Sequence, residues 1–224
     1  MMQATLSNAM TSTNNAMTPT NVILDIDNLT VQRGEFSLCE NVCLTLNVGS
    51  ICHLIGSNGT GKTTLLMQLA GLLPILTGSI RYQGQADIPI QPLYVSHQLG
   101  IHPNLTVAQN LCFLLNLYGI TPSKDDIDDA LTWVGLQGFE TISSSHLSAG
   151  QTRRITLARL YLLTPEVTPL WLLDEPFTAL DVDMVERMED RLREFATSGG
   201  SIVMTSHQAV GVVDQVLDLS EYRV

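Results

Sequence analysis

Apolar residues follow two different spacings along this chain, and each spacing predicts a different kind of element. Short apolar or alternating runs are typical of β-strands, whereas apolar residues repeated every three or four positions are typical of helices. The first pattern predicts strands in residues 21–31, 41–47, 51–56, 79–85, 92–98, 170–176 and 201–207. The second pattern predicts helices in residues 61–73, 107–119, 123–136, 148–163 and 183–200.

The order of these elements indicates the architecture. Strands that alternate with helices are typical of an α/β core with parallel strands. The segment 51–56 is mostly apolar, as expected for a strand that is buried on both faces. The helical block between about residues 99 and 147 is expected to form a subdomain inserted into this core. Residues 1–20 contain no charged side chain, and we expect them to form a disordered extension.

Composition and charge exclude several functions. The 224 residues are 45% hydrophobic and carry a formal net charge of -11. Such acidity argues against broad nucleic-acid binding, because proteins neutralise the phosphate backbone with Lys and Arg. No apolar run approaches the roughly 18 residues of a membrane span. The N-terminal extension lacks the basic and apolar regions of a signal peptide, so the chain is expected to stay in the cytoplasm.

The cysteines and histidines are scattered rather than grouped as metal ligands. Cys39 and Cys43 are four residues apart, but no second pair completes a zinc site. These two and the remaining cysteines, Cys52 and Cys112, are expected to be buried reduced thiols. His53 lies in an apolar strand and is expected to pack in the core rather than to bind a ligand.

The segment GSNGTGKT, residues 56–63, follows a predicted strand and begins a predicted helix, which is the context of a P-loop. Its glycines let the backbone direct N–H groups at phosphates, and the helix N-terminus adds partial positive charge. Lys62 is expected to reach the β- and γ-phosphates of ATP, and the Thr63 hydroxyl is expected to ligate Mg²⁺. The predicted ATP-binding residues are Gly56, Ser57, Asn58, Gly59, Thr60, Gly61, Lys62, Thr63 and Thr64.

Two acidic residues, Asp174 and Glu175, follow the apolar run LWLL. Sites in an open parallel sheet form at the carboxyl ends of its strands. Asp174 is expected to bind Mg²⁺ directly or through water, and Glu175 to polarise or orient the attacking water. The alternative is that both acids only cap the following helix, and the P-loop upstream favours the catalytic interpretation.

The segment HLSAGQTRR, residues 146–154, places small residues at a predicted helix start, ahead of two arginines. Ser148 fits the N-cap position, and a helix N-terminus can bind an anion. The P-loop already serves the nucleotide of this chain. We therefore expect Ser148 and Gly150 to face a nucleotide held by a second copy, so that two copies placed head to tail close two ATP sites.

Taken together, these motifs resemble those of the ABC-type ATPases, the nucleotide-binding domains of ABC transporters. LSAGQ resembles the signature motif of that family, Asp181 matches its D-loop, and His207 matches its switch histidine, which contacts the γ-phosphate. The resemblance implies a P-loop NTPase core sheet with antiparallel N-terminal strands and an inserted α-helical subdomain. It also implies ATP hydrolysis, ATP and Mg²⁺ as cofactors, a nucleotide contact by Asp181 and a homodimer of ATPase subunits.

Two elements of the family pattern are ambiguous here. The family carries a glutamine after the strand that ends in YV, where it senses Mg²⁺ and water. His97 occupies the usual position, but Gln98 is favoured because a carboxamide can ligate the metal and bond water at once. The resemblance thus gives Gln98 a catalytic and metal-binding role beside Glu175 and His207. For stacking on adenine the candidates are Arg33, through its guanidinium plane, and Phe36.

Three longer stretches resemble one subfamily, the ATP-binding subunits of the haem exporters used in cytochrome c maturation. They are HQLGIHPNLTVAQNL, LSAGQTRRITLARLYL and LWLLDEPFTALDVD. This resemblance runs from about residue 22 to the C-terminus. The link LTPEVTPLWLL is a few residues longer than is usual in the subfamily, and we expect a surface loop there.

The subfamily resemblance implies partners and a location. ATP hydrolysis would power haem export, or the release of a haem-loaded chaperone, through a transmembrane permease subunit of CcmB type with CcmC- and CcmD-like proteins. The chain would lie peripherally on the cytoplasmic face of the inner membrane, with no membrane span and no nucleic-acid partner. The expected division is an extension at 1–20 and an ABC ATPase domain at 21–224, with the helical subdomain at about 99–147.

Other functions remain as alternatives at this point. The chain could serve an ABC transporter for another substrate, because the membrane subunit chooses the cargo. A soluble ABC protein of translation or DNA repair usually has two cassettes, a coiled-coil insert or a zinc module, and this sequence has none of these. A P-loop kinase needs neither LSAGQ nor His207.

Overall fold

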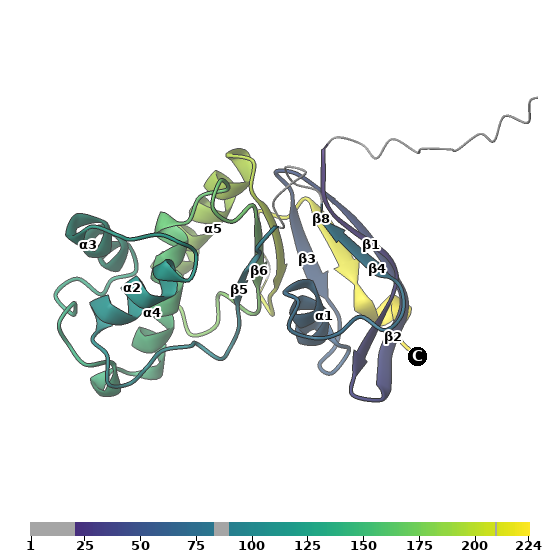
Figure 1. The fold of residues 1–224 in the computed structure, drawn as a ribbon, viewed down its shortest axis with the longest axis horizontal. Coiled ribbons are helices and arrows are strands. Elements are labelled where there is room, and N and C mark those ends of the chain that lie inside the picture. Colours follow the sequence, from purple (N-terminus) through teal and green to yellow (C-terminus); the bar gives the residue numbers. More distant parts are fainter. Residues whose placement is uncertain (1–20, 83–89, 209) are drawn as a thin grey trace, which may run out of the picture.

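A computed structural model describes residues 21–82, 90–208 and 210–224. The predicted extension at 1–20 and the end of the predicted strand at 79–85 lie outside the described residues. Figure 1 shows a β-rich half on the right and a helical half on the left, with a second sheet between them. The fold class predicted from the sequence, with an antiparallel sheet and a parallel sheet, is confirmed.

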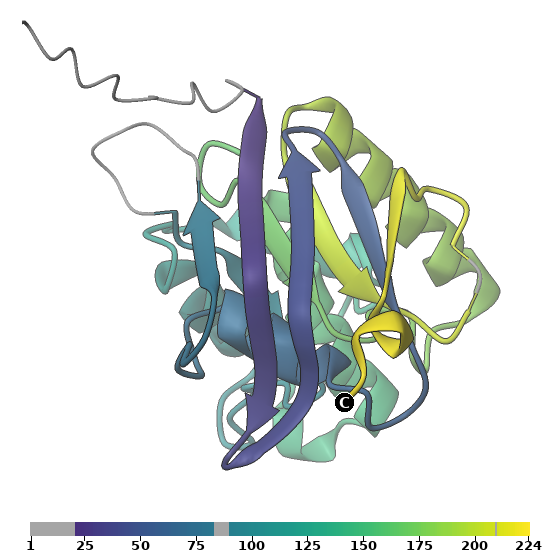
Figure 2. The same cartoon turned by 90° about the vertical axis from the view of Figure 1, so that its right-hand side faces the viewer.

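The antiparallel sheet is made by the N-terminal strands (Figure 2). It contains β1 (Val22–Arg33), β2 (Phe36–Asn47) and β4 (Ser79–Tyr82), in the order β2-β1-β4. Buried and exposed residues alternate along the second half of β2, because successive side chains of a strand point to opposite faces. One face of this sheet therefore packs on the core.

The parallel sheet carries the central part of the fold. Its strands are β3 (Ile51–Ile55), β5 (Leu93–Val95), β6 (Leu170–Leu173), β7 (Ser201–Thr205) and β8 (Gln215–Asp218), in the order β5-β6-β7-β3-β8. All neighbouring strands in it are parallel. Every residue of β6 and β7 is buried, as expected for strands covered on both faces. The carboxyl ends of these strands lie at one edge of the sheet, where a ligand site is expected.

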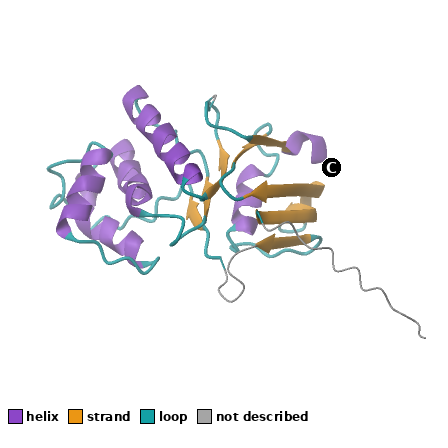
Figure 3. Ribbon diagram, turned by 90° about the horizontal axis from the view of Figure 1, so that it is seen from above, coloured by secondary structure: helices purple, strands orange, loops and turns teal. Residues whose placement is uncertain are grey.

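Helix α1 (Lys62–Leu69) lies between the two sheets (Figure 3). Its residues Leu65, Leu66 and Leu69 share one buried apolar cluster with side chains from both sheets. The helix is shorter than the predicted 61–73, because the chain turns at Gly71, whose φ is positive, and Pro74 follows soon after. Packing against both sheets therefore holds α1 in place.

Four further helices share a second apolar cluster with the other face of the parallel sheet. They are α2 (Val107–Asn116), α3 (Lys124–Trp133), α4 (Ala149–Leu162) and α5 (Val182–Thr197). In this cluster α5 packs on β7, while α2 and α3 pack on α4. Short 3-10 helices η1 (Ser144–His146) and η2 (Leu219–Tyr222) complete the described elements. Helices α2 and α3 lie between β5 and α4 in the chain. No helix of the described residues has the length and apolarity that a membrane crossing needs.

The expectation that all four cysteines are buried is wrong. Cys39 and Cys52 are buried, but Cys43 is exposed and Cys112 is half-buried. Cys43 lies on the face of β2 that points to solvent, between the buried residues Val42 and Leu44. His53 is half-buried, and its Nε2 lies 3.2 Å from the carbonyl oxygen of Ser206.

Candidate functional site

The loop between β3 and α1 has the backbone geometry of a phosphate-binding loop. Gly56, Gly59 and Gly61 have φ values of 140°, 84° and 105°, which side chains other than hydrogen rarely allow. A Cβ atom on Gly56 would lie 2.7 Å from Thr60 Oγ1, and one on Gly61 would lie 3.0 Å from Val31 Cγ1. All three positions thus favour glycine through φ, and close packing adds to this at Gly56 and Gly61.

The start of α1 is open to a ligand. Gly61 occupies the N-cap position in a left-handed conformation and makes no side-chain cap. The first N–H groups of a helix have no intrahelical partner, so these groups are available to an anion. Lys62 Nζ donates to the carbonyl oxygens of Gly56, at 2.7 Å, and Ser57, at 3.3 Å. The ammonium group therefore already lies over the loop that would hold the phosphates.

Thr63 and Asp174 provide two oxygen atoms suited to Mg²⁺. Thr63 Oγ1 donates to Asp174 Oδ2 at 2.8 Å, and Thr205 Oγ1 donates to Asp174 Oδ1 at 2.8 Å. Neighbouring ligands of an octahedral Mg²⁺ with bonds of about 2.1 Å are roughly 3 Å apart. Asp174 is only 4% exposed, so the second hydroxyl also compensates its burial. A hydroxyl and a carboxylate at this separation fit the ion without rearrangement of the strands.

Glu175 is held in an unusual backbone conformation. Its φ is positive and lies in the left-handed region. For a non-glycine residue this conformation costs on the order of 1–3 kcal/mol. Its N–H donates to Thr205 Oγ1 at 2.8 Å, and its carbonyl oxygen accepts from the Arg153 guanidinium. Its Oε2 accepts from the backbone N–H of His207 at 3.1 Å, and His207 Nε2 lies 3.5 Å from its Oε1. The predicted pair Glu175 and His207 is thus brought together.

These groups share one cavity of about 390 Å³. Its lining includes most of the predicted phosphate-binding and metal-binding residues, together with both members of the Glu175–His207 pair. Of the two candidates for adenine stacking, Arg33 lines the cavity, whereas Phe36 does not and is 77% exposed. The residues that line the cavity are Arg33, Leu38, Asn58, Gly59, Gly61, Lys62, Thr63, Thr64, Asp174, Glu175 and His207.

Other predicted residues lie apart from this cavity. Gln98 and His97 are both exposed and do not line it, and Gln98 bonds through its backbone to Ser96 Oγ. Ser148 and Gly150 are at the start of α4, also outside the lining. Ser148 is the N-cap of α4, as the sequence predicts. Its Oγ accepts from the Gln151 N–H at 3.2 Å, and its N–H donates to Gln151 Oε1 at 2.9 Å.

Asp181 begins α5, where its Oδ1 accepts from the N–H of Met184 at 2.9 Å. Its Oδ2 pairs with the Arg154 guanidinium, which also donates to the carbonyl oxygen of Val134 at 3.2 Å. The hydrogen bond from Met184 and the interaction with Arg154 hold the pKa of Asp181 below its usual value. Asp181 therefore connects the starts of α4 and α5.

The sequence motifs predicted no role for Arg153, Arg154 or Thr205. The structure places Arg153 against Glu175, Arg154 against Asp181, and Thr205 between Asp174 and Glu175. For Arg153 and Arg154, the only sequence feature that singled them out was their position as an Arg-Arg pair just after LSAGQ. Thr205 ends a buried strand and carries no pattern that distinguishes it from a packed threonine.

Comparisons with known proteins agree with this geometry. The model of the ABC transporter family matches residues 39–178. The chain belongs to the ABC transporter family. It is an ABC-type ATPase subunit, and the resemblance in sequence to the subunits of cytochrome c maturation is confirmed by its relatives.

Two relatives carry the name cytochrome c biogenesis ATP-binding export protein CcmA. The protein from Saccharophagus degradans is 38% identical in an alignment of 208 residues that covers 87% of this chain and 92% of that protein. The protein from Escherichia coli K12 is 39% identical over 198 residues, with 86% and 92% covered. An ABC transporter ATP-binding protein from Pyrococcus furiosus has a solved structure that is 26% identical, with a TM-score of 0.78 over 90% of this chain and 99% of that one.

Proposed function

We propose that this ABC ATPase powers a membrane transporter of cytochrome c biogenesis, either for haem export or for release of a haem-loaded chaperone. The observation that carries the proposal is the 38% identity, over most of both chains, to an export protein named for cytochrome c biogenesis. The intact set of ATP-site residues around one cavity supports an active rather than a degenerate ATPase.

ATP is held by the P-loop in this proposal. Backbone N–H groups between Gly56 and Lys62 bind the phosphates, and the Lys62 ammonium turns from the loop carbonyls to the β- and γ-phosphates. Mg²⁺ held by Thr63 and Asp174 would neutralise charge on those phosphates. Arg33 lies at the cavity, where a guanidinium plane can stack on the adenine.

Hydrolysis depends on the Glu175–His207 pair. The Glu175 carboxylate accepts a hydrogen bond from the attacking water and orients it toward the γ-phosphate. The backbone N–H of His207 fixes one oxygen of that carboxylate, and the imidazole lines the same cavity as the P-loop, which supports a contact with the γ-phosphate. Gln98 would complete the site from the loop after β5, and its exposed position supports movement between the nucleotide and a membrane partner.

A second copy of the chain completes each site. In the cap of α4 the Ser148 oxygen accepts a hydrogen bond, which leaves its hydroxyl proton to donate to a phosphate oxygen. The N–H groups of Ala149 and Gly150 are also in the first helical turn, where they lack intrahelical partners. Since this terminus is exposed and outside the cavity of its own chain, a head-to-tail homodimer gives it a nucleotide to bind.

The membrane partners follow from the proposed transporter. They are a CcmB-like permease subunit with CcmC- and CcmD-like proteins, and the chain itself lies peripherally on the cytoplasmic face of the inner membrane. The helical subdomain, about residues 99–147, is the part proposed to transmit opening and closing of the dimer to the permease.

The test is a haem stain for covalently attached c-type cytochromes in a strain that lacks this gene. We expect the stained bands to vanish, and to return with the wild-type chain but not with Lys62→Ala. Immunodetection of the Lys62→Ala chain in the same cells controls for its abundance. Bands that persist in the deletion strain would leave an ABC ATPase that serves another substrate.

A further inference from the structure

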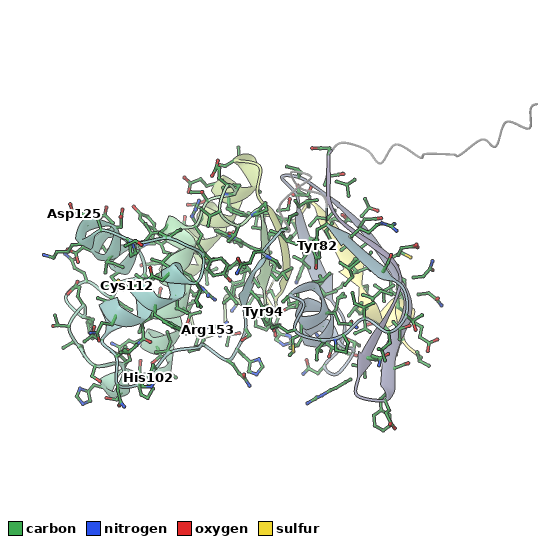
Figure 4. The ribbon with its side chains drawn as sticks, viewed as in Figure 1. Tyr82, Tyr94, His102, Cys112, Asp125 and Arg153 are labelled. Carbon is green, nitrogen blue, oxygen red and sulfur yellow. The ribbon has the colours of Figure 1, made fainter. Side chains whose placement is uncertain are left out.

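A buried arginine of α4 lies against the hydrolytic centre. Arg153 is only 7% exposed, and its guanidinium donates through Nη2 to the carbonyl oxygen of Glu175. Figure 4 labels it in the helical half, on the side toward the parallel sheet. Burial lowers the pKa of the guanidinium from its usual value, and the nearby carboxylates of Asp174 and Glu175 oppose that shift.

Burial of such a charge is costly unless specific partners compensate it. Arg159, on the same helix, is equally buried and donates to the carbonyl oxygen of Tyr94 at 3.1 Å. Arg191, on α5, donates to the carbonyl oxygens of Leu160 and Leu163, both at 2.8 Å. Of these three arginines, Arg153 alone contacts a residue of the ATP site. Its role therefore differs from that of Arg159 and Arg191, which join their helices to neighbouring backbone.

We propose that Arg153 is a positioning residue for ATP hydrolysis, which fixes the backbone of Glu175 so that its carboxylate faces the attacking water. This inference rests on the proposed role of Glu175. The peptide groups on both sides of Glu175 are then clamped, since Thr205 Oγ1 accepts from its N–H and Arg153 donates to its carbonyl oxygen.

The left-handed φ of Glu175 explains why a clamp is needed. This backbone conformation is unfavourable for a side chain with a Cβ, and it persists only where surrounding contacts hold it. Without the Arg153 contact the carbonyl oxygen loses a charge-assisted hydrogen bond, and the residue can relax toward a commoner conformation. Rotation there swings the carboxylate away from the N–H of His207.

Arg153 also lies five residues after Ser148 on the same helix. A helix is stiff over such a length, so movement of its N-terminus carries Arg153 with it. Contact of Ser148 with a nucleotide of the second copy would therefore shift Arg153 and change the position of Glu175 in the same chain. The contact gives one route by which closure at one site sets the geometry at the other.

The test compares purified full-length variants in single-turnover hydrolysis of radiolabelled ATP. For Arg153→Met we expect a rate lowered roughly 10- to 100-fold, the size of effect that misplacement of a reacting group produces. The Kd for a fluorescent ATP analogue should change less than about 2-fold, because the P-loop is untouched. Arg153→Lys should restore part of the rate by supplying a donor to the carbonyl oxygen.

Arg191→Met is the matched control, since it also removes a half-buried guanidinium that donates to backbone carbonyls, but one that does not line the ATP-site cavity. Its rate should stay at the wild-type value at a temperature where both variants are folded by circular dichroism. A wild-type rate for folded Arg153→Met, or an equal loss in Arg191→Met, would overturn the positioning role.

A double-mutant cycle separates the two proposals. If Arg153 acts through Glu175, adding Arg153→Met to Glu175→Gln should lower the residual rate less than about 2-fold. Fully additive losses would show that Arg153 acts elsewhere. A normal rate for Glu175→Gln alone would refute the proposed role of Glu175, whereas loss in Glu175→Gln with a normal rate in Arg153→Met would refute only the positioning role.

Discussion

Helices α1 and α4 both begin after small residues, but their first turns are completed in opposite ways. The start of α1 has Gly61 as an N-cap without a side-chain bond, in a cavity of its own chain. The start of α4 has Ser148 and Gln151 in a reciprocal capping box and is exposed. In the described residues α2, α3 and α5 also begin with side-chain caps, so α1 is the exception among five helices.

This difference in capping indicates which nucleotide each helix start binds. An uncapped terminus leaves its N–H groups unsatisfied. Those of α1 can therefore bind an anionic ligand in the cavity of the same chain. A capped terminus is stable without a ligand, so its ligand can be one that a second molecule supplies. The contrast supports binding of nucleotide phosphates by α1 and recognition of a second copy's nucleotide by α4.

The largest effect should come from Lys62→Ala, which removes the cation at the start of α1. Hydrogen bonds from a charged group contribute about 1.5–3 kcal/mol each, so the Kd for ATP should rise roughly 100-fold. Titration with a fluorescent ATP analogue measures this. The fold should persist, because the ammonium bonds only to carbonyls of its own loop. An unchanged Kd would refute the P-loop assignment and with it the contrast with α4.

Ser148→Asp tests the other side of the contrast. Aspartate is as good an N-cap as serine, so α4 and the stability of the chain should be preserved. Its negative charge would face the phosphates of a second copy, and opposed like charges cost several kcal/mol. In a Glu175→Gln background, which should accumulate the ATP-bound dimer, Ser148→Asp should abolish the dimer peak in size-exclusion chromatography.

The matched control for that experiment is Ser148→Asn, which also caps the helix but carries no charge. It should retain most of the dimer, and both variants should bind ATP with the wild-type Kd. A full dimer peak for Ser148→Asp would mean that the start of α4 faces no phosphate.

Glycine-to-alanine changes at the two helix starts should differ in sign. Gly61→Ala introduces a Cβ at a strongly positive φ and 3.0 Å from Val31 Cγ1. Backbone strain of this kind should lower the free energy of unfolding by roughly 1–3 kcal/mol. A Cβ on Gly150 meets the Ala179 carbonyl oxygen at an ordinary 3.7 Å. Gly150→Ala should therefore raise stability by up to about 1 kcal/mol, since alanine is the better helix former. Urea unfolding measures both, and equal losses would contradict the prediction.

The same two helix starts show what the sequence could predict. The P-loop was predictable because its glycines, its lysine and its threonine act within eight consecutive residues between a strand and a helix. The carboxylates of Asp174 and Glu175 were predictable because parallel strands end at one edge of the sheet. Ser148 was predictable as an N-cap because capping is local.

The remaining contacts depend on how distant elements pack. Arg153 and Glu175 are 22 residues apart in the chain, and Arg154 and Asp181 are 27 apart. Helical spacing gives the face on which an arginine lies but not the strand end that the face meets. The choice between Arg33 and Phe36 likewise depended on the turn between β1 and β2, which leaves Phe36 in solvent. Gln98 remains a prediction.

The smallest expected effect concerns the ion pair that anchors the start of α4. Asp181 pairs with Arg154, and its pKa in the folded chain is below the usual value of 3.8. A lowered pKa means that Asp181 stabilises the fold above pH 3.8, and that this contribution is lost as pH falls through the folded pKa. Asp181→Asn should therefore be less stable than wild type at pH 7, and the difference should shrink steadily below about pH 4.

Urea midpoints of both proteins at pH 7, 5, 4 and 3 measure this difference, and the other titrating groups largely cancel because both proteins share them. Asparagine can still cap α5, so the part that changes with pH reports mainly on the charge of Asp181. A difference that stays constant from pH 7 to pH 3 would show that the Arg154–Asp181 pair adds nothing to the anchoring of α4. The start of α4 would then be stabilised by its capping box without help from the ion pair, whereas α1 is held by packing between the sheets.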